Sequence, residues 1–192
     1  MPDLAAPSPT GSPLDLAEML DEVDRERDAD AALDRIDALR RRIAGASVFS
    51  IQQNVTTADD APNEIRLRRY YSSEGRDYPV NGTKRKTLTA WTERLFVHGR
   101  PFIGEGAETL AQHFDDYARM SSWNLQSVVN IPLMQGAICY ATFNVFGSRS
   151  CWMPHELLGI RVLALAAARW VPVAPRLSYR LHAESHPDLK EA

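Results

Sequence analysis

Apolar residues recur at helical spacing near both ends of the chain. Between residues 14 and 44 they stand three or four positions apart, interrupted by the charged segment Asp24–Asp30. This pattern predicts either one long amphipathic helix with a solvated middle or two helices that meet near residues 28–30, where an aspartate would serve as N-cap. A second helical pattern starts at Pro154 and continues to Val171, with small residues on its packing face.

Alternation of apolar and polar residues predicts strands in the middle of the chain. Ser47–Val55 and Glu64–Ser72 flank a turn rich in Asp, Pro and Asn, so we expect them to be antiparallel neighbours. A short strand is expected at Pro101–Ile103. Two more strands, Ser127–Pro132 and Ala137–Phe146, are joined by a turn at Gly136.

Two helices and one polar segment lie between these strand pairs. Ser73–Lys86 holds two glycines and one proline without an apolar pattern, which predicts a mobile loop or a lid. Thr87–His98 and Ala107–Ala118 carry apolar residues at helical spacing. We therefore expect a helical insertion between the first and second strand pairs.

The stretch from Ser127 to Arg169 resembles the C-terminal half of a GAF domain, a family of small-molecule-binding modules. The matching features are Ser127 to Pro132, Gly136, the strand Tyr140–Phe146, and Trp152–Leu157 before the final helix. The resemblance implies an α+β, GAF/PAS-like fold with a central antiparallel sheet of five or six strands. It also implies N- and C-terminal helices on one face of that sheet and the insertion over the other.

The predicted organisation has four parts. Residues 1–13 are rich in Pro, Ser and Ala and are predicted to be a disordered leader. Residues 14–29 form an N-terminal helical extension, and residues 30–171 form the GAF-like domain. Residues 172–192, with three prolines and several charges, are predicted to be an arm or a disordered tail.

Composition limits the classes of function. The 192 residues have a net charge of -3, which creates no field that would attract nucleic acid or an anionic membrane. The longest apolar run, Val162–Ala168, is far shorter than a membrane span. Two cysteines and no signal-peptide pattern predict a cytoplasmic protein without a disulfide framework.

The strand at residues 137–146 carries the candidate chemistry. One predicted face is wholly apolar and suits helix packing: Ala137, Cys139, Ala141, Phe143 and Val145. The other face carries Tyr140, Thr142 and Asn144 between apolar groups, a composition typical of a small-ligand site. These side chains would equally suit an ordinary semi-polar core in which they hydrogen-bond to one another or to nearby backbone.

Other residues are expected to complete this site. Asn130 lies in an otherwise apolar strand, where its amide needs hydrogen-bond partners. Trp91, His113 and Trp123 lie on the inserted segments that would close over the sheet, although His113 also suits a core position with a local partner. The predicted ligand-binding residues are Tyr140, Thr142, Asn144, Asn130, Trp123, His113 and Trp91.

We therefore predict a non-catalytic sensory domain that binds a small organic ligand of unknown identity. The resemblance further implies a homodimer through the helices at Leu33–Ile43 and Leu157–Val171. The alternatives are a purely structural dimerisation module and a thiol-dependent enzyme similar to the GAF-like proteins that reduce free methionine sulfoxide. Cys139 and Cys151 are not clustered as that chemistry requires, and the scattered histidines predict no metal site. The sequence identifies no cofactor.

Overall fold

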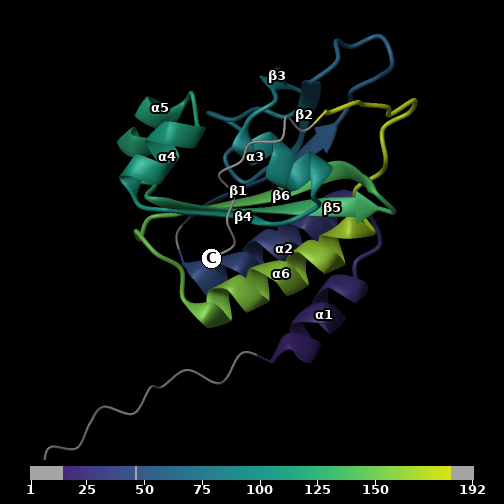
Figure 1. The fold of residues 1–192 in the computed structure, drawn as a ribbon. Coiled ribbons are helices and arrows are strands. Elements are labelled where there is room, and N and C mark those ends of the chain that lie inside the picture. Colours follow the sequence, from purple (N-terminus) through teal and green to yellow (C-terminus); the bar gives the residue numbers. More distant parts are fainter. Residues whose placement is uncertain (1–14, 46, 183–192) are drawn as a thin grey trace, which may run out of the picture.

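The computed structural model describes residues 15–45 and 47–182, so the predicted leader and residues 183–192 of the predicted tail lie outside the described residues. Figure 1 shows three layers, with a sheet between two groups of helices. Helices α1 (Leu16–Asp24), α2 (Ala29–Ala44) and α6 (Pro154–Ala168) lie on one face. The helical insertion lies on the other face. This arrangement is the predicted α+β architecture.

The sheet has six strands in the order β3-β2-β1-β6-β5-β4, and each neighbouring pair is antiparallel. Its strands β1, β5 and β6 are largely buried, which explains the apolar sequences of β5 and β6, whereas β1 also buries several polar side chains. The strand bounds are β1 Ser47–Asn54, β2 Glu64–Ser72, β3 Thr83–Thr87, β4 Phe102–Glu105, β5 Ser127–Gln135 and β6 Ile138–Gly147.

Four short helical elements form the insertion. Between β3 and β4 the chain forms α3 (Ala90–Thr92), which continues directly into a π-helical turn, η1 (Glu93–Val97). Between β4 and β5 it forms α4 (Ala107–His113) and α5 (Tyr117–Ser122), where the sequence predicted one helix. The helix expected at Thr87–His98 is thus present, but its second half is wound more widely than an α-helix.

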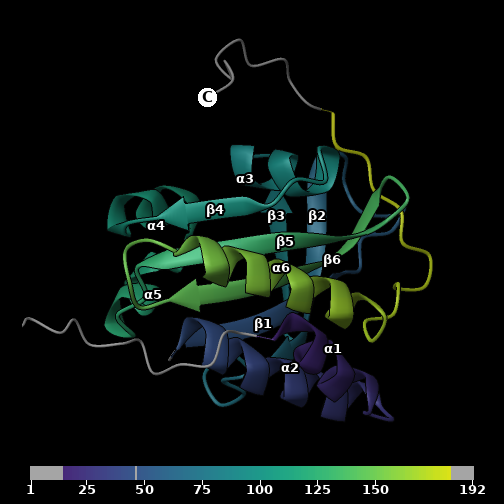
Figure 2. The same ribbon diagram turned by 90° about the horizontal axis from the view of Figure 1, so that it is seen from below.

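The terminal helices begin where the sequence places capping residues. The Asp15 carboxylate accepts hydrogen bonds from the amides of Ala17 and Glu18, and Asp28 accepts one from Ala31, so the N-terminal pattern forms two helices. Figure 2 shows α6 over the β5 and β6 side of the sheet, with α1 and α2 beside it. Gly159 allows this close packing, because a Cβ there would lie 2.8 Å from Ile43 Cδ1.

The three layers enclose two apolar cores, one on each face of the sheet. The helix-side core joins α1, α2 and α6 to the sheet and includes Ile36, Phe49, Phe143, Val145 and Leu163. The insertion-side core joins the sheet to α3, η1, α4 and α5 and includes Ile65, Leu67, Leu95, Phe96 and Leu110. Ala141, Phe143 and Val145 belong to the helix-side core, as the alternation predicted.

Two bulges change the faces of particular strand residues. In β6, Ala141 pairs with Leu133 and Cys139 pairs with Met134, so Tyr140 is an extra residue without a partner in β5. In β2, Tyr71 pairs with Ile51 and Arg69 pairs with Gln52, which leaves Tyr70 as the extra residue. Strict alternation is interrupted at both tyrosines.

The bulge in β6 contradicts two predictions about side-chain direction. Tyr140 lies in the helix-side core, where its hydroxyl donates to the Ala168 carbonyl at 2.8 Å, and it does not face the insertion. Cys139 lies in the insertion-side core instead of facing the terminal helices. An inserted residue shifts the two-residue period by one position, so every residue before it on the strand changes face.

The segment Ser73–Lys86 is not a loop throughout. Its last residues form the edge strand β3, which pairs with β2 from Glu64 to Arg68. Only residues 73–82 connect the two strands without regular structure. The consecutive charged residues Lys84, Arg85 and Lys86 of this strand are typical of an exposed sheet edge. Within the described residues, no helix combines the length and apolar character that a membrane span requires.

Residues 172–182 run as an arm from the end of α6, where Leu177 packs on the helix-side core, to the insertion side of the molecule. Ser178 donates from its amide to the Thr56 carbonyl, and Asn63 donates to the Arg180 carbonyl. Tyr179 inserts between the sheet and η1: its hydroxyl accepts a hydrogen bond from the Cys139 amide at 2.9 Å and donates to the Phe96 carbonyl at 3.0 Å. The arm therefore joins the start of β6 to the π-helix.

We expect Tyr140→Phe to lower the free energy of unfolding by about 1 kcal/mol, because one of the terminal carbonyls of α6 loses its partner. Urea unfolding followed by circular dichroism measures this change. Tyr117→Phe is the matched control, since the Tyr117 hydroxyl makes no hydrogen bond to a described residue. Equal stability of Tyr140→Phe and the unmodified protein would contradict the bonding role of this hydroxyl.

Candidate functional site

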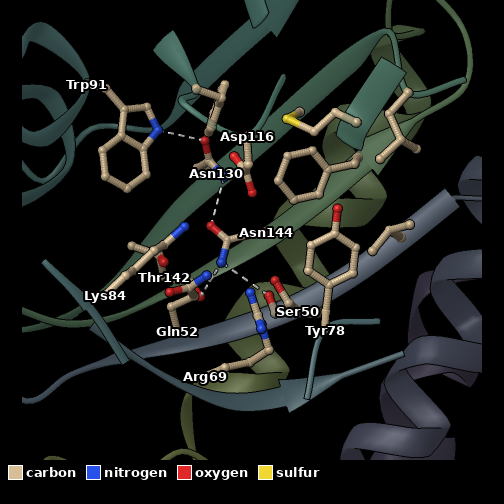
Figure 3. A pocket seen from close by; sticks show the side chains of 15 residues that line it. Ser50, Gln52, Arg69, Tyr78, Lys84, Trp91, Asp116, Asn130, Thr142 and Asn144 are labelled. Atoms are coloured by element: carbon tan, nitrogen blue, oxygen red, sulfur yellow. Dashed lines mark hydrogen bonds between the residues drawn. The ribbon is translucent and has the colours of Figure 1, made fainter. Parts of the chain in front are cut away.

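A cavity lies between the sheet and the helical insertion. About 40 Å³ of it admits the centre of a water-sized sphere, and about 590 Å³ of the surrounding region, which includes space open to solvent, holds no protein atom. Five strands supply its floor and sides, and α3, α5 and the neighbouring loops cover it (Figure 3). The lining side chains are Val48, Ser50, Gln52, Arg69, Tyr78, Lys84, Trp91, Phe114, Asp116, Met120, Leu125, Asn130, Thr142, Asn144 and Phe146.

A chain of amide hydrogen bonds crosses the cavity floor (Figure 3). The Trp91 indole N–H donates to Asn130 Oδ1 at 2.9 Å, and Asn130 Nδ2 donates to Asn144 Oδ1 at 2.7 Å. Asn144 Nδ2 then donates to the carbonyls of Ser50 and Thr142. Because Asn130 and Asn144 pair directly across β5 and β6, the register of the sheet fixes this chain.

These bonds leave the two amides largely satisfied. Each buried carboxamide has a protein partner for its oxygen and at least one for its nitrogen, as a buried polar group requires. They also fix the Trp91 ring over the sheet, where it packs edge-on against Phe114. The floor is therefore a rigid polar surface, and its orientation does not depend on a ligand.

Thr142 differs from the two asparagines. Its side chain is fully buried, at 0% exposure, and lines the cavity. Its Oγ1 has no hydrogen-bond partner among the described residues. A buried hydroxyl without a partner costs free energy, so this atom is a position where a bound molecule would gain a hydrogen bond.

Three charged side chains line the opposite part of the cavity. Arg69 comes from β2 and Lys84 from β3, on neighbouring strands, while Asp116 precedes α5. Lys84 is half-buried and makes no hydrogen bond or ion pair with any described residue. Burial lowers the pKa of both Lys84 and Arg69, because each cation loses hydration.

Tyr78 holds Arg69 in place. The Arg69 guanidinium lies 5.1 Å from the Tyr78 ring centre, and Arg119 lies 5.6 Å from the same ring. One Arg69 nitrogen also donates to the Pro79 carbonyl, whereas its Nε is buried without a partner in the described chain. Burial and the nearby Asp116 carboxylate raise the pKa of Tyr78, so its hydroxyl stays neutral.

Four of the seven predicted ligand-binding residues line this cavity: Trp91, Asn130, Thr142 and Asn144. Tyr140 does not, because the β6 bulge directs it to the terminal helices. The His113 ring packs at a tilt against Phe102, with ring centres 4.9 Å apart, and its Nδ1 lies 2.9 Å from the Thr109 carbonyl, so it has a local structural role. Trp123 packs edge-on against Tyr78 at 5.7 Å, behind a lining residue.

Sequence reasoning missed the charged part of the cavity. Arg69 lies on the same alternating face of β2 as the apolar residues Ile65 and Leu67. A cation on an otherwise apolar face could have indicated that the strand borders a polar site. Lys84 lies in a segment without apolar periodicity, so the residues next to it in the sequence do not indicate that its side chain faces inward. Asp116 follows another aspartate, and only the break between α4 and α5 places it at the cavity.

The two thiols do not form a reactive pair. Cys139 lies at the start of β6 and Cys151 lies beyond its far end, so most of the length of the strand separates them. Burial raises the pKa of the Cys139 thiol to about 12, which keeps it protonated at neutral pH. No cluster of three or more His, Cys, Asp or Glu side chains suited to a metal occurs in the part of the chain that the structure describes.

The fold and the cavity together define an α+β domain with a pocket between its sheet and a helical insertion. Among solved structures, the GAF domain of a phosphoenolpyruvate-protein phosphotransferase from Coxiella burnetii is similar, with a TM-score of 0.59 and 14% identity over 80% of this chain and 88% of that one. The GAF domain of a two-component sensor histidine kinase from Bacillus halodurans has a TM-score of 0.51 and 12% identity, covering 71% and 92%.

The chromophore-binding domain of a bacteriophytochrome from R. palustris is also similar, with a TM-score of 0.55 and 10% identity over 80% of this chain and 59% of that one. No family model matches the sequence, and no curated protein sequence matches it. At these identities the likeness concerns the fold. The chain has a GAF-like fold, as the resemblance of Ser127–Arg169 implied.

We expect a thiol-alkylating reagent at neutral pH to modify exposed Cys151 and to leave buried Cys139 unmodified in the folded protein. Mass spectrometry of proteolytic peptides after a short exposure measures both sites. The same reaction in urea is the control, since both thiols are then accessible. Modification of Cys139 as fast as Cys151 in the folded protein would show that the start of β6 opens readily.

Proposed function

We propose that this chain is a non-catalytic sensory domain that binds a small organic ligand in the cavity under Trp91. The observation that carries the proposal is the Thr142 hydroxyl, which is buried in the wall of the cavity without a partner in the described chain. The amide chain from Trp91 to Asn144 already holds the floor in one geometry, so ligand binding requires little reordering there.

The similar structures support a sensory role by analogy. One is described as the domain of a sensor histidine kinase and another as a chromophore-binding domain, and both place a sheet and helices as this chain does. The same fold carries different functions in different proteins. The proposal therefore rests on the cavity of this chain, and its location in the cytoplasm stays a prediction from the sequence.

A ligand under Trp91 has a structural route to the surface. Trp91 lies in α3, which continues into η1, and the Phe96 carbonyl of η1 accepts the hydrogen bond from Tyr179. A shift of the Trp91 ring on ligand binding would therefore be transmitted to the arm at residues 172–182. Sensory domains need such a link between a buried ligand and an exposed segment.

A thermal-shift screen of small metabolites is expected to find a compound that raises the melting temperature. In Thr142→Val the ligand-induced rise should fall by at least half, because the nearly isosteric side chain cannot hydrogen-bond. The stability of the free variant should be unchanged or higher by about 1 kcal/mol, since an unpaired buried hydroxyl is removed.

Tyr140→Phe is the control for this experiment, because Tyr140 lies on the other face of the sheet and should retain the full ligand effect. A stabilising ligand whose effect is undiminished in Thr142→Val would refute the assignment of this cavity. A screen in which no compound stabilises the protein, combined with a crystal structure showing the cavity filled by its own side chains, would favour the purely structural alternative.

We further propose that the protein forms a homodimer through α6. The apolar residues of α2 that the sequence suggested for this contact, Leu33 to Ile43, are buried within the protomer. On α6, by contrast, Leu158 is 54% exposed and Leu165 is 77% exposed, and they stand two turns apart on the same side of the helix. An exposed apolar row on a helix is typical of a contact surface.

Analytical ultracentrifugation of the unmodified protein should show a dimer, and Leu158→Glu with Leu165→Glu should shift it to the monomer without loss of helical content. Leu20→Glu on α1 is the matched control, because Leu20 is another exposed leucine outside this row. A monomeric unmodified protein, or a double variant that remains dimeric, would exclude this interface.

A further inference from the structure

The charged part of the cavity contains more positive than negative groups. Arg69 and Lys84 line it together with the single carboxylate of Asp116. Tyr78 and the asparagines that also line it are neutral, and no other charged side chain lines it within the described residues. Two cations and one carboxylate leave one uncompensated positive charge beside a partly enclosed apolar space.

Neither Lys84 nor Arg69 forms an ion pair with another described residue. Lys86, two residues from Lys84 on the same strand, is paired with Asp115, and Arg85 is paired with Glu64 and Asp60. Neither Lys84 nor Arg69 has a carboxylate within ion-pair distance among the described residues. Asp116 is near enough to favour the charged form of both cations, but it is not in direct contact with either. Two partly dehydrated cations that share one carboxylate are stabilised by an anion that enters the site.

The rest of the cavity defines the body of the ligand. Trp91, Phe114 and Phe146 present aromatic surface, and Met120 and Leu125 close the side. Thr142 offers a hydroxyl without a partner between the charged part and the amide floor. A flat apolar group would pack against the aromatic rings while a charged group at one end reaches Lys84 and Arg69.

We infer that the ligand is a small aromatic monocarboxylate, whose carboxylate binds between Lys84 and Arg69 and accepts a hydrogen bond from the Thr142 hydroxyl. This inference rests on the proposed ligand-binding function of the same cavity. One net positive charge matches a singly charged carboxylate, whereas a phosphate dianion would leave excess negative charge near Asp116. The planar guanidinium of Arg69 lies over the Tyr78 ring, which restricts its position before a ligand binds.

Benzoate and benzamide are suitable probes, because they share shape and differ in charge. Titration followed by two-dimensional NMR of the isotopically labelled protein should show the Trp91 indole N–H signal shifting with both probes. Benzoate should bind about tenfold more tightly than benzamide, a difference of ~1.4 kcal/mol. Added salt should weaken only the binding of benzoate.

Lys84→Gln and Arg69→Gln should each remove most of the preference for benzoate, because each variant lowers the affinity for benzoate more than the affinity for benzamide. Lys86→Gln and Arg85→Gln remove the same charge from neighbouring positions that do not line the cavity, and both should retain the preference. The melting temperature of each free variant verifies that it is folded.

Equal affinity for the two probes, tighter binding of phenyl phosphate than of benzoate, or no binding of benzoate at all would overturn the inference. These results are distinct from failure of the proposed function. A neutral metabolite that stabilises the protein through Thr142 would support ligand binding while refuting the carboxylate, whereas a benzoate shift that Thr142→Val and Lys84→Gln both leave intact would refute the cavity assignment itself.

Discussion

The structure depends on two one-residue insertions in its sheet. The bulges at Tyr70 and Tyr140 lie on β2 and β6, the two neighbours of β1, and each directs its tyrosine toward the terminal helices. Both hydroxyls donate to carbonyls at the C-terminal end of α6, those of Trp170 and Ala168. The same two bulges leave Arg69 facing the cavity and Cys139 facing the insertion. Their positions therefore determine both which side chains bond to α6 and which side chains line the cavity.

Much of the fold follows from periodicity, because buried strands and amphipathic helices must repeat every two or every 3.6 residues. The bounds of β2, the caps at Asp28 and the start of α6 at Pro154 are all visible in the sequence. Thr142 and Asn144 were assigned correctly to the insertion side, since regular alternation holds from Ala141 onward. Bulges carry no composition signal of their own, and for that reason Tyr140 was assigned to the wrong face.

Two kinds of polar group line the cavity. Asn130, Asn144 and Trp91 satisfy one another across three elements, so their polarity serves the internal structure of the domain. Thr142, Lys84 and Arg69 are left with unused hydrogen-bonding or charge capacity within the described residues. The sequence marked the first group because an amide in an apolar strand is unusual. The sequence did not indicate that Lys84 faces the cavity. The residues of an exposed edge strand contain no information about a loop, distant in the sequence, that covers one of them.

The Tyr179 hydroxyl connects the arm at residues 172–182 to the centre of the molecule through hydrogen bonds whose opening can be measured. Burial raises its pKa to about 12, so it remains a neutral phenol that can accept from the Cys139 amide and donate to the Phe96 carbonyl. The Cys139 amide is therefore protected by a side chain 40 residues later in the chain and not by a neighbouring strand. Its exchange with deuterated solvent requires the arm to lift from the sheet, so a single amide proton reports the rate at which residues 172–182 detach.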